Sequence, residues 1–346
     1  MRRTTLIAAV CAIAATVLAA SPAVAATPTS DIVELPITFQ VKNTNRTPVL
    51  CQSDGKDYTV RGTVIAPRDA LDSGDAATLY LHAVTWGQYY WNFKGVPDYA
   101  YARQLAEKGH VSVAVDRLGY GDSDRPPGLD TCFGSEADVA GQMVDALRSG
   151  DYELDGGEGT SFEKVFIGGS SVGGLISHIT AYSFHNVDGV FNMSWGDFAA
   201  SAFTAVELAD VLKRCAQGGD PGADPNYAAF FKNSREKFYF NSATQDVRDA
   251  VPALNPDPCG QLRSIPAGIV SDVLHNGEID VPVLVMFGDA DAVFPPPAAD
   301  QQALRYTGSP EVTKVIIKDA SHYPNVEANH LDVVNAVDTW LTRNGG

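Results

Sequence analysis

The side chain best placed for covalent chemistry is the hydroxyl of Ser171, in the motif Gly169-x-Ser171-x-Gly173. An apolar run at 165–167 leads into the motif and a helical pattern follows it, which is the order of a strand, a sharp turn and a helix. Such a turn exposes a serine hydroxyl beyond the end of a strand, and the glycines allow neighbouring backbone to approach closely. The motif alone is weak evidence, because a chain with 31 glycines forms such strings in ordinary loops.

A serine hydroxyl is a poor nucleophile at neutral pH unless a general base lies within hydrogen-bond reach. His322 is our candidate base, because it alone among the histidines follows a late apolar run, at 314–317. An isolated histidine is usually structural, so this position is what favours catalysis. The histidines that compete with it are His82, His110, His178, His185, His275 and His330.

The base needs an acid to orient it, and three aspartates stand just after apolar runs. Asp289 and Asp291 follow the run at 283–287, and Asp197 follows the run at 190–193. Parallel strands deliver the residues beyond their carboxyl ends to one edge of a sheet. Each of these aspartates could therefore lie near Ser171.

The chain order of serine, then aspartate, then histidine resembles that of the α/β-hydrolase superfamily. The segment 110–123, with glycines in its loop, is similar to the strand and loop that precede the nucleophile there. The resemblance covers most of the chain beyond residue 25. The alternative is an unrelated doubly wound α/β protein, in which the three motifs and the segment 110–123 would have to occur in this order by chance.

The resemblance implies a role for each aspartate. The pattern Gly288-x-x-Asp291 matches the superfamily's acid loop, so Asp291 is expected to orient His322 and Asp289 to form a turn. A minority arrangement of the superfamily would use Asp197 instead. Ser171, Asp291 and His322 are therefore the expected catalytic residues.

The tetrahedral oxyanion of such a reaction needs two preorganised N–H donors. The backbone of Val172, at the start of the helix after Ser171, is the expected first donor. The second is expected in the loop 81–87, where the superfamily usually shows His-Gly and this chain has His82-Ala83. That departure leaves Val84 and Thr85 as alternatives, of which we choose Val84.

The periodicity predicts an α/β fold with a doubly wound, mostly parallel, eight-stranded sheet. Strands are expected at 37–41, 58–66, 78–82, 111–115, 165–167, 190–193, 283–287 and 314–317. Helices are expected at 99–107, 136–147, 172–182, 298–305 and 328–342.

Residues 195–280 break this alternation. They carry several helical stretches and glycine- and proline-rich turns, at a place where α/β-hydrolases commonly insert a cap. We expect a cap insertion at 195–280 that bounds the substrate pocket, with the hydrolase core at 26–194 and 281–346. A surface excursion that touches no substrate is the alternative.

Residues 1–25 are predicted to be a secretory signal peptide, with Arg2 and Arg3, an apolar run at 6–20, and Ala23-Val24-Ala25 before the cleavage point. The apolar run is too short and rich in alanine for a membrane span, so we expect a secreted protein with no stable membrane anchor. Removal of the signal leaves 23 of the 25 basic residues against 42 acidic ones, a net charge of −19. Such a surface does not favour nucleic acid.

Four cysteines remain after that cleavage, and an even number in an exported chain suggests two disulfides. Four cysteines allow three pairings, and the simplest joins Cys51 to Cys132, before Ser171, and Cys215 to Cys259, within the insertion. Metal binding is disfavoured because closely spaced Cys and His residues are lacking.

The activity that the resemblance implies is hydrolysis of a carboxylic ester through an acyl-enzyme, with no cofactor and no metal. The aromatic stretch 89–93 is expected to supply apolar surface beside Ser171, under the cap, so we expect soluble small-molecule esters of short to medium chain length. A peptidase, a lactonase or another acyl hydrolase would use the same residues. A binding protein on the same scaffold would have lost one of them.

Overall fold

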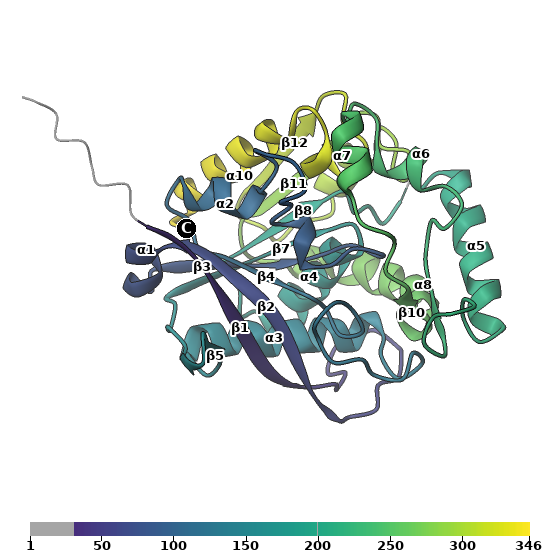
Figure 1. The fold of residues 1–346 in the computed structure, drawn as a ribbon, viewed down its shortest axis with the longest axis horizontal. Coiled ribbons are helices and arrows are strands. Elements are labelled where there is room, and N and C mark those ends of the chain that lie inside the picture. The colour runs from purple at the N-terminus through teal and green to yellow at the C-terminus, as the bar shows by residue number, and fades with distance from the viewer. Residues whose placement is uncertain (1–30, 199) are drawn as a thin grey trace, which may run out of the picture. The chain divides into compact units, whose positions relative to one another are not determined.

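The computed structural model describes residues 31–198 and 200–346. Strands from much of this length form one large twisted sheet. Its strands are β1 (Ile32–Lys42), β2 (Asp57–Pro67), β3 (Ala76–Leu81), β4 (Ser112–Val115), β5 (Glu153–Leu154), β6 (Gly157–Glu158), β7 (Lys164–Ser170), β8 (Gly189–Met193), β11 (Val283–Gly288) and β12 (Val312–Ile317). Their order across the sheet is β12-β11-β8-β7-β3-β4-β2-β1-β5-β6 (Figure 1). The signal peptide expected at 1–25 lies outside the described residues.

The central strands pair in parallel, from β4 through β3, β7, β8 and β11 to β12, and β1, β2, β5 and β6 pair antiparallel. β7, β8 and β11 are almost entirely buried, as expected for strands with helices on both faces. The predicted doubly wound, mostly parallel sheet is thus confirmed. All eight expected strands are present.

Two strands of this sheet were not expected. β5 and β6 form a two-residue hairpin that pairs with β1 at the edge of the sheet, so the sheet has ten strands rather than eight. The connecting residues are Asp155 and Gly156, both with positive φ. An Asp-Gly pair is a strong hairpin signal, but strands of two residues show no periodicity that a sequence pattern can reveal.

The five expected helices are present, with bounds that differ by at most three residues: α2 (Tyr101–Ala106), α3 (Phe133–Ser149), α4 (Val172–Phe184), α9 (Ala298–Ala303) and α10 (His330–Asn344). A further short helix, α1 (Arg68–Ser73), follows β2. α3 packs on α4, and α2 packs on α10. Figure 1 shows α3 on one side of the sheet and α2 and α10 on the other.

The segment between β8 and β11 forms a helical region, seen at the right of Figure 1. It contains α5 (Ala202–Ala216), α6 (Arg235–Tyr239), α7 (Gln245–Ala250), α8 (Cys259–His275) and a two-stranded ribbon of β9 (Tyr227–Ala228) and β10 (Asp257–Pro258). The cysteines pair as expected, with S–S distances of 2.08 Å for Cys51–Cys132 and 2.05 Å for Cys215–Cys259. The second disulfide joins the end of α5 to the start of α8.

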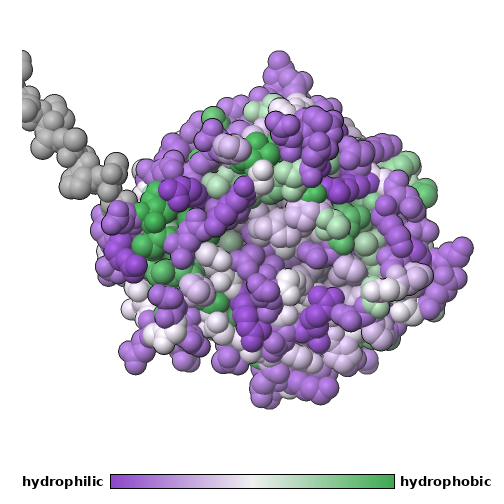
Figure 2. Space-filling model, in the orientation of Figure 1, coloured by the Kyte–Doolittle hydropathy of each residue, from purple (hydrophilic) through white to green (hydrophobic). Residues whose placement is uncertain are grey.

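The surface of the described residues is mostly polar. Figure 2 shows hydrophilic side chains over most of one face, with smaller apolar patches between them. No helix in the described part of the chain is long and apolar enough to cross a membrane.

Candidate active site

Ser171 occupies a strained turn between β7 and α4, with φ 53° and ψ −121°. A positive φ is costly for a residue with a side chain and is often found at functional sites. The glycines of the motif are required by close packing: a Cβ on Gly169 would lie 2.0 Å from the carbonyl carbon of Gly173, and one on Gly173 would lie 2.3 Å from the carbonyl oxygen of Leu81. The spacing of the motif therefore follows from the tightness of this turn.

His322 and Asp291 form a fully buried pair. The imidazole Nδ1 lies 2.9 Å from Oδ2 and 3.1 Å from Oδ1 of the carboxylate. Oδ1 also accepts the backbone N–H groups of Val293, at 2.7 Å, and Phe294, at 3.0 Å. These contacts hold the carboxylate in place and leave Nε2 of His322 as the free ring nitrogen, which is buried and has no hydrogen-bond partner among the described residues.

The register of the sheet explains why these residues meet. β7, β8, β11 and β12 are neighbours and parallel, with Ser170 opposite Met193 and Gly288 opposite Ile317. The loops that follow them carry Ser171, Asp291 and His322, so all three lie beyond the same edge. Ser171 thereby shares one candidate site with Asp291 and His322, which follow it by 120 and 151 residues in the sequence.

The other two aspartates have different surroundings. Asp289 is exposed, and its backbone N–H donates to the carbonyl of Ile317. Asp197 accepts hydrogen bonds from Asn276 at 2.8 Å and Gln302 at 3.3 Å. His322 is paired with neither of them.

Two backbone N–H groups beside Ser171 have no hydrogen-bond partner among the described residues, those of Val172 and Val84. Val172 begins α4, whose free N-terminal amides favour negative charge. The N–H of Thr85, the alternative second donor, is occupied because it donates to Oδ1 of Asp257 at 2.7 Å. Thr85 itself has a φ of 63°.

An apolar cavity of about 160 Å³ opens beside Ser171. The nucleophile motif and the loop after β3 contribute Ser171, Val172 and Val84 to its wall, and the loop after Asp291 contributes Phe294. The helical segment supplies most of the rest: Ala200, Thr204, Ala205, Leu208, Phe230, Phe231, Ile265 and Ile269. Residues of the segment 195–280 therefore form most of the wall of this cavity.

The expectation that residues 89–93 line this cavity is wrong. Tyr90 and Trp91 are fully buried, and their rings pack on those of Tyr323, Tyr80 and Tyr101 in the core. Aromatic side chains bury a large area and are core residues by default. The aromatic side chains in the wall are instead Trp195, Phe230, Phe231 and Phe294. The sequence around Phe230 and Phe231 offers no motif.

The comparisons with known proteins agree with this geometry. The sequence profile described as the Alpha/beta hydrolase family matches residues 78–337. The chain belongs to the alpha/beta hydrolase family. That span includes β3, the Ser171 turn, the helical segment and the His322 loop, so the resemblance to this superfamily is confirmed and the hydrolase class with it.

Solved structures share the fold of this hydrolase at low sequence identity. An esterase from Exiguobacterium antarcticum aligns with a TM-score of 0.59 at 16% identity, over 86% of this chain and 98% of its own. A thermophilic esterase from Thermogutta terrifontis aligns with a TM-score of 0.57 at 17% identity, over 89% and 100%. A monoacylglycerol lipase from Paleococcus ferrophilus gives 0.55 at 19%, over 77% and 94%. No curated protein matches the sequence.

A buried polar network lies behind the cavity of the hydrolase and was not foreseen. Nδ1 of His178 on α4 lies 2.8 Å from Oδ2 of Asp272 on α8. The indole N–H of Trp195 reaches both Asp272, at 3.2 Å, and Asp197, at 3.3 Å. Burial and then the neighbouring Asp272 charge raise the pKa of Asp197 to about 7. Sequence offers little signal for such a network, because its members come from three separate elements.

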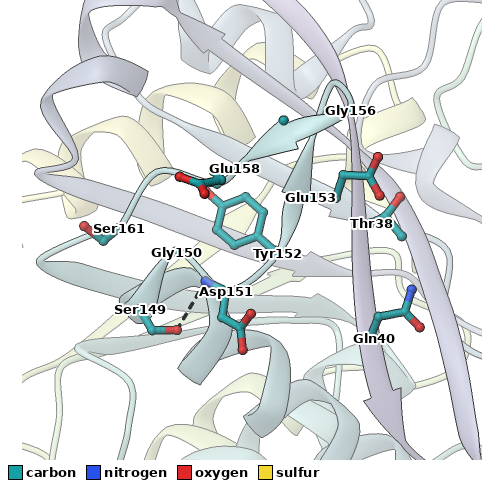
Figure 3. A pocket seen from close by; sticks show the side chains of 12 residues that line it. Thr38, Gln40, Ser149, Gly150, Asp151, Tyr152, Glu153, Gly156, Glu158 and Ser161 are labelled. Atoms are coloured by element: carbon teal, nitrogen blue, oxygen red, sulfur yellow. Dashed lines mark hydrogen bonds between the residues drawn. The ribbon is translucent and has the colours of Figure 1, made fainter.

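A second hollow, of about 660 Å³, lies at the opposite edge of the sheet (Figure 3). It is open, and its walls are polar residues of β1, the end of α3 and the β5–β6 hairpin, such as Gln40, Asp151 and Glu158. In the sheet order, three strands lie between β7 and β1, the nearest strand that lines this hollow. In the described ranges, 31–198 and 200–346, His, Cys, Asp and Glu side chains form no group that could hold a metal ion.

Proposed function

We propose that this hydrolase is a secreted serine esterase that cleaves soluble carboxylic esters of short acyl chain length through an acyl-enzyme. The observation that carries the proposal is the buried pair of His322 and Asp291, which has a free Nε2 and lies beyond the same edge of the sheet as the strained Ser171. A serine hydroxyl attacks a carbonyl only when a base takes its proton, and a carboxylate keeps a histidine base in the correct orientation. The oxyanion would accept hydrogen bonds from Val172 and Val84.

The proposed steps follow from these groups. The Ser171 hydroxyl attacks the ester carbonyl while Nε2 of His322 takes its proton, and Asp291 stabilises the imidazolium that results. The alcohol leaves with that proton, and a water molecule, deprotonated by the same nitrogen, releases the acid. No cofactor is needed for either half of the reaction.

The cavity supports the choice of substrate. At about 160 Å³ it is smaller than the roughly 300–1,000 Å³ of pockets that enclose drug-sized ligands, and its wall is nearly all apolar. A short acyl chain or a small alcohol fits such a space. A peptidase would need a group that recognises a charged terminus. Among the described residues of the wall the one carboxylate is Asp197, which already accepts hydrogen bonds from Asn276 and Gln302.

Export of the chain is proposed on two grounds. Residues 1–25 have the charged, apolar and small-residue regions of a signal peptide, and the two disulfides suit an oxidising compartment. The division into core at 26–194 and 281–346 and cap at 195–280 is also a proposal, supported by the cavity that the cap covers.

Labelling with a fluorophosphonate followed by peptide mapping tests the nucleophile. We expect the label on Ser171, and we expect Ser171→Ala to lose about 10⁴-fold or more in kcat with little change in Tm. Ser170→Ala is the matched control, since Ser170 is the last residue of β7. A label on Ser170 would overturn the assignment.

A panel of matched esters and amides tests the reaction. We expect kcat/KM to be highest on short-chain esters. A kcat/KM that is higher on a peptide than on every ester would instead assign the hydrolase to the peptidases.

A further inference from the structure

The cap segment holds the backbone of the candidate oxyanion loop through one buried carboxylate. Asp257 on β10 is fully buried, and its Oδ1 accepts the N–H of Thr85 at 2.7 Å. Thr85 follows Val84 directly and has a left-handed backbone, with φ 63°. For a β-branched residue this conformation is unfavourable unless its surroundings impose it. The hydrogen bond to Asp257 is a contact that can do so.

Two further cap residues hold the same short loop. Asn255 donates its backbone N–H to the carbonyl of Thr85 at 3.0 Å and its side-chain amide to the carbonyl of Trp86 at 3.0 Å. The hydroxyls of Tyr239 and Thr85 are also hydrogen-bonded. The loop after β3 is thus anchored to the cap rather than to the sheet alone.

The other oxygen of Asp257 reaches the wall of the cavity. Oδ2 accepts the N–H of Phe230 at 2.9 Å, and Phe230 and Phe231 both line the cavity. Phe231 has a φ of 53°, which is a genuine outlier for a bulky aromatic residue. One carboxylate therefore restrains two segments of backbone that both contribute to the wall of the same cavity.

The core also contributes to this arrangement. The hydroxyl of Tyr120, in the loop after β4, donates to Oδ1 of Asp257 at 2.8 Å. Three donors on one buried carboxylate satisfy most of its hydrogen-bonding capacity, and hydrogen bonds to a charged acceptor are stronger than neutral ones. Asp257 therefore has the contacts of a rigid support rather than those of a ligand-binding group.

We propose that Asp257 is a positioning residue for the oxyanion hole. By accepting the N–H of Thr85 it holds the loop so that the N–H of Val84 remains free beside Ser171 and Val172, and by accepting the N–H of Phe230 it couples that loop to the aromatic wall. The oxyanion hole is then complete only while the cap is docked. This inference rests on the proposed esterase function.

Two substitutions at this position separate the two roles. Asp257→Ala removes every acceptor, so the loop is released, and kcat on a short-chain ester should fall about 10- to 100-fold, near or below the loss of one oxyanion donor. In Asp257→Asn the amide oxygen can still accept from Thr85 and Tyr120, and the amide nitrogen then faces the N–H of Phe230. That variant should retain most of kcat and raise KM.

A trifluoromethyl ketone gives a second readout, because its adduct with a serine carries an oxyanion. Its inhibition constant should rise in Asp257→Ala by about the same factor as kcat falls, whereas a merely destabilised fold would lower Tm and the active fraction without changing this constant. Asp224→Asn is the control: its exposed carboxylate on the cap forms an ion pair with Arg125 on the surface, and both kinetic constants should stay at wild-type values.

The outcomes separate this inference from the proposed function. A wild-type protein that neither hydrolyses esters nor reacts with the fluorophosphonate overturns both. An active wild type whose folded Asp257→Ala variant keeps its kcat and its inhibition constant overturns the positioning role alone. If the alanine variant does not fold, Asp257→Asn decides, since a fall in kcat with an unchanged KM contradicts the proposed division of roles.

Discussion

Replacing Asp291 with asparagine should abolish nearly all activity, and the structure shows why through the orientation of the new amide. Oδ1 of Asp291 accepts two backbone N–H groups, from Val293 and Phe294, and Oδ2 lies 2.9 Å from Nδ1 of His322. The asparagine oxygen will take the Oδ1 position, because placing the NH₂ there would set it against two donors. The NH₂ group must then face Nδ1 of His322.

That orientation selects the wrong tautomer of the base. An N–H donor opposite Nδ1 requires this nitrogen to be the acceptor, which places the ring proton on Nε2. Nε2 can then no longer take the proton of Ser171. The loss in kcat should be about 10⁴-fold, as for the corresponding change in other serine triads, or about 5.5 kcal/mol of transition-state stabilisation.

Kinetics on a short-chain ester at fixed pH, with Tm measured alongside, check this prediction. Asp291→Asn should leave Tm nearly unchanged, because the shape and the two backbone hydrogen bonds are kept. Asp289→Asn is the matched control in the same loop, with an exposed side chain, and its effect on kcat should be mild. A comparable loss in Asp289→Asn, or a larger loss in Asp197→Asn, would refute the assignment.

Two further predictions concern stability and substrate. Burial raises the pKa of Asp197 to about 7. Between about pH 4 and pH 7 the folded protein therefore keeps a proton on this carboxyl group that the unfolded chain has released. The free energy of unfolding should fall as the pH rises through this range, by at most about 4 kcal/mol. Asp197→Asn should flatten this slope in urea unfolding measured at pH 5 and pH 8, and an unchanged slope would contradict the raised pKa. Phe231→Ala should enlarge the cavity and move the preferred acyl chain to greater length, at a cost of about 3–5 kcal/mol in stability; an unchanged chain-length profile would show that this wall does not contact the acyl group. α5 exposes the apolar side chains of Phe203 and Val206. The ester panel should therefore include an emulsion, which tests whether these side chains bind a lipid surface. We expect little activation on it.

Much of the fold was predictable because its signals are local. A buried parallel strand is a short apolar run, an amphipathic helix repeats every 3.6 residues, and a strained turn before a helix requires glycines. These rules located the eight principal strands and the turn at Ser171. Parallel strands deliver the residues beyond their carboxyl ends to one edge of the sheet, so the residues after β7, β11 and β12 could be expected together there.

The sequence by itself therefore determined the α/β architecture, the hydrolase class and a short set of candidate residues. Only the tertiary structure decided among the alternatives within that set. The N–H of Thr85, unlike that of Val84, is occupied by Asp257, 172 residues away, and the cavity wall includes Phe230 and Phe231 but not residues 89–93. Such contacts join segments distant in sequence, and packing and hydrogen-bond geometry select them without leaving a periodic or local pattern in the chain.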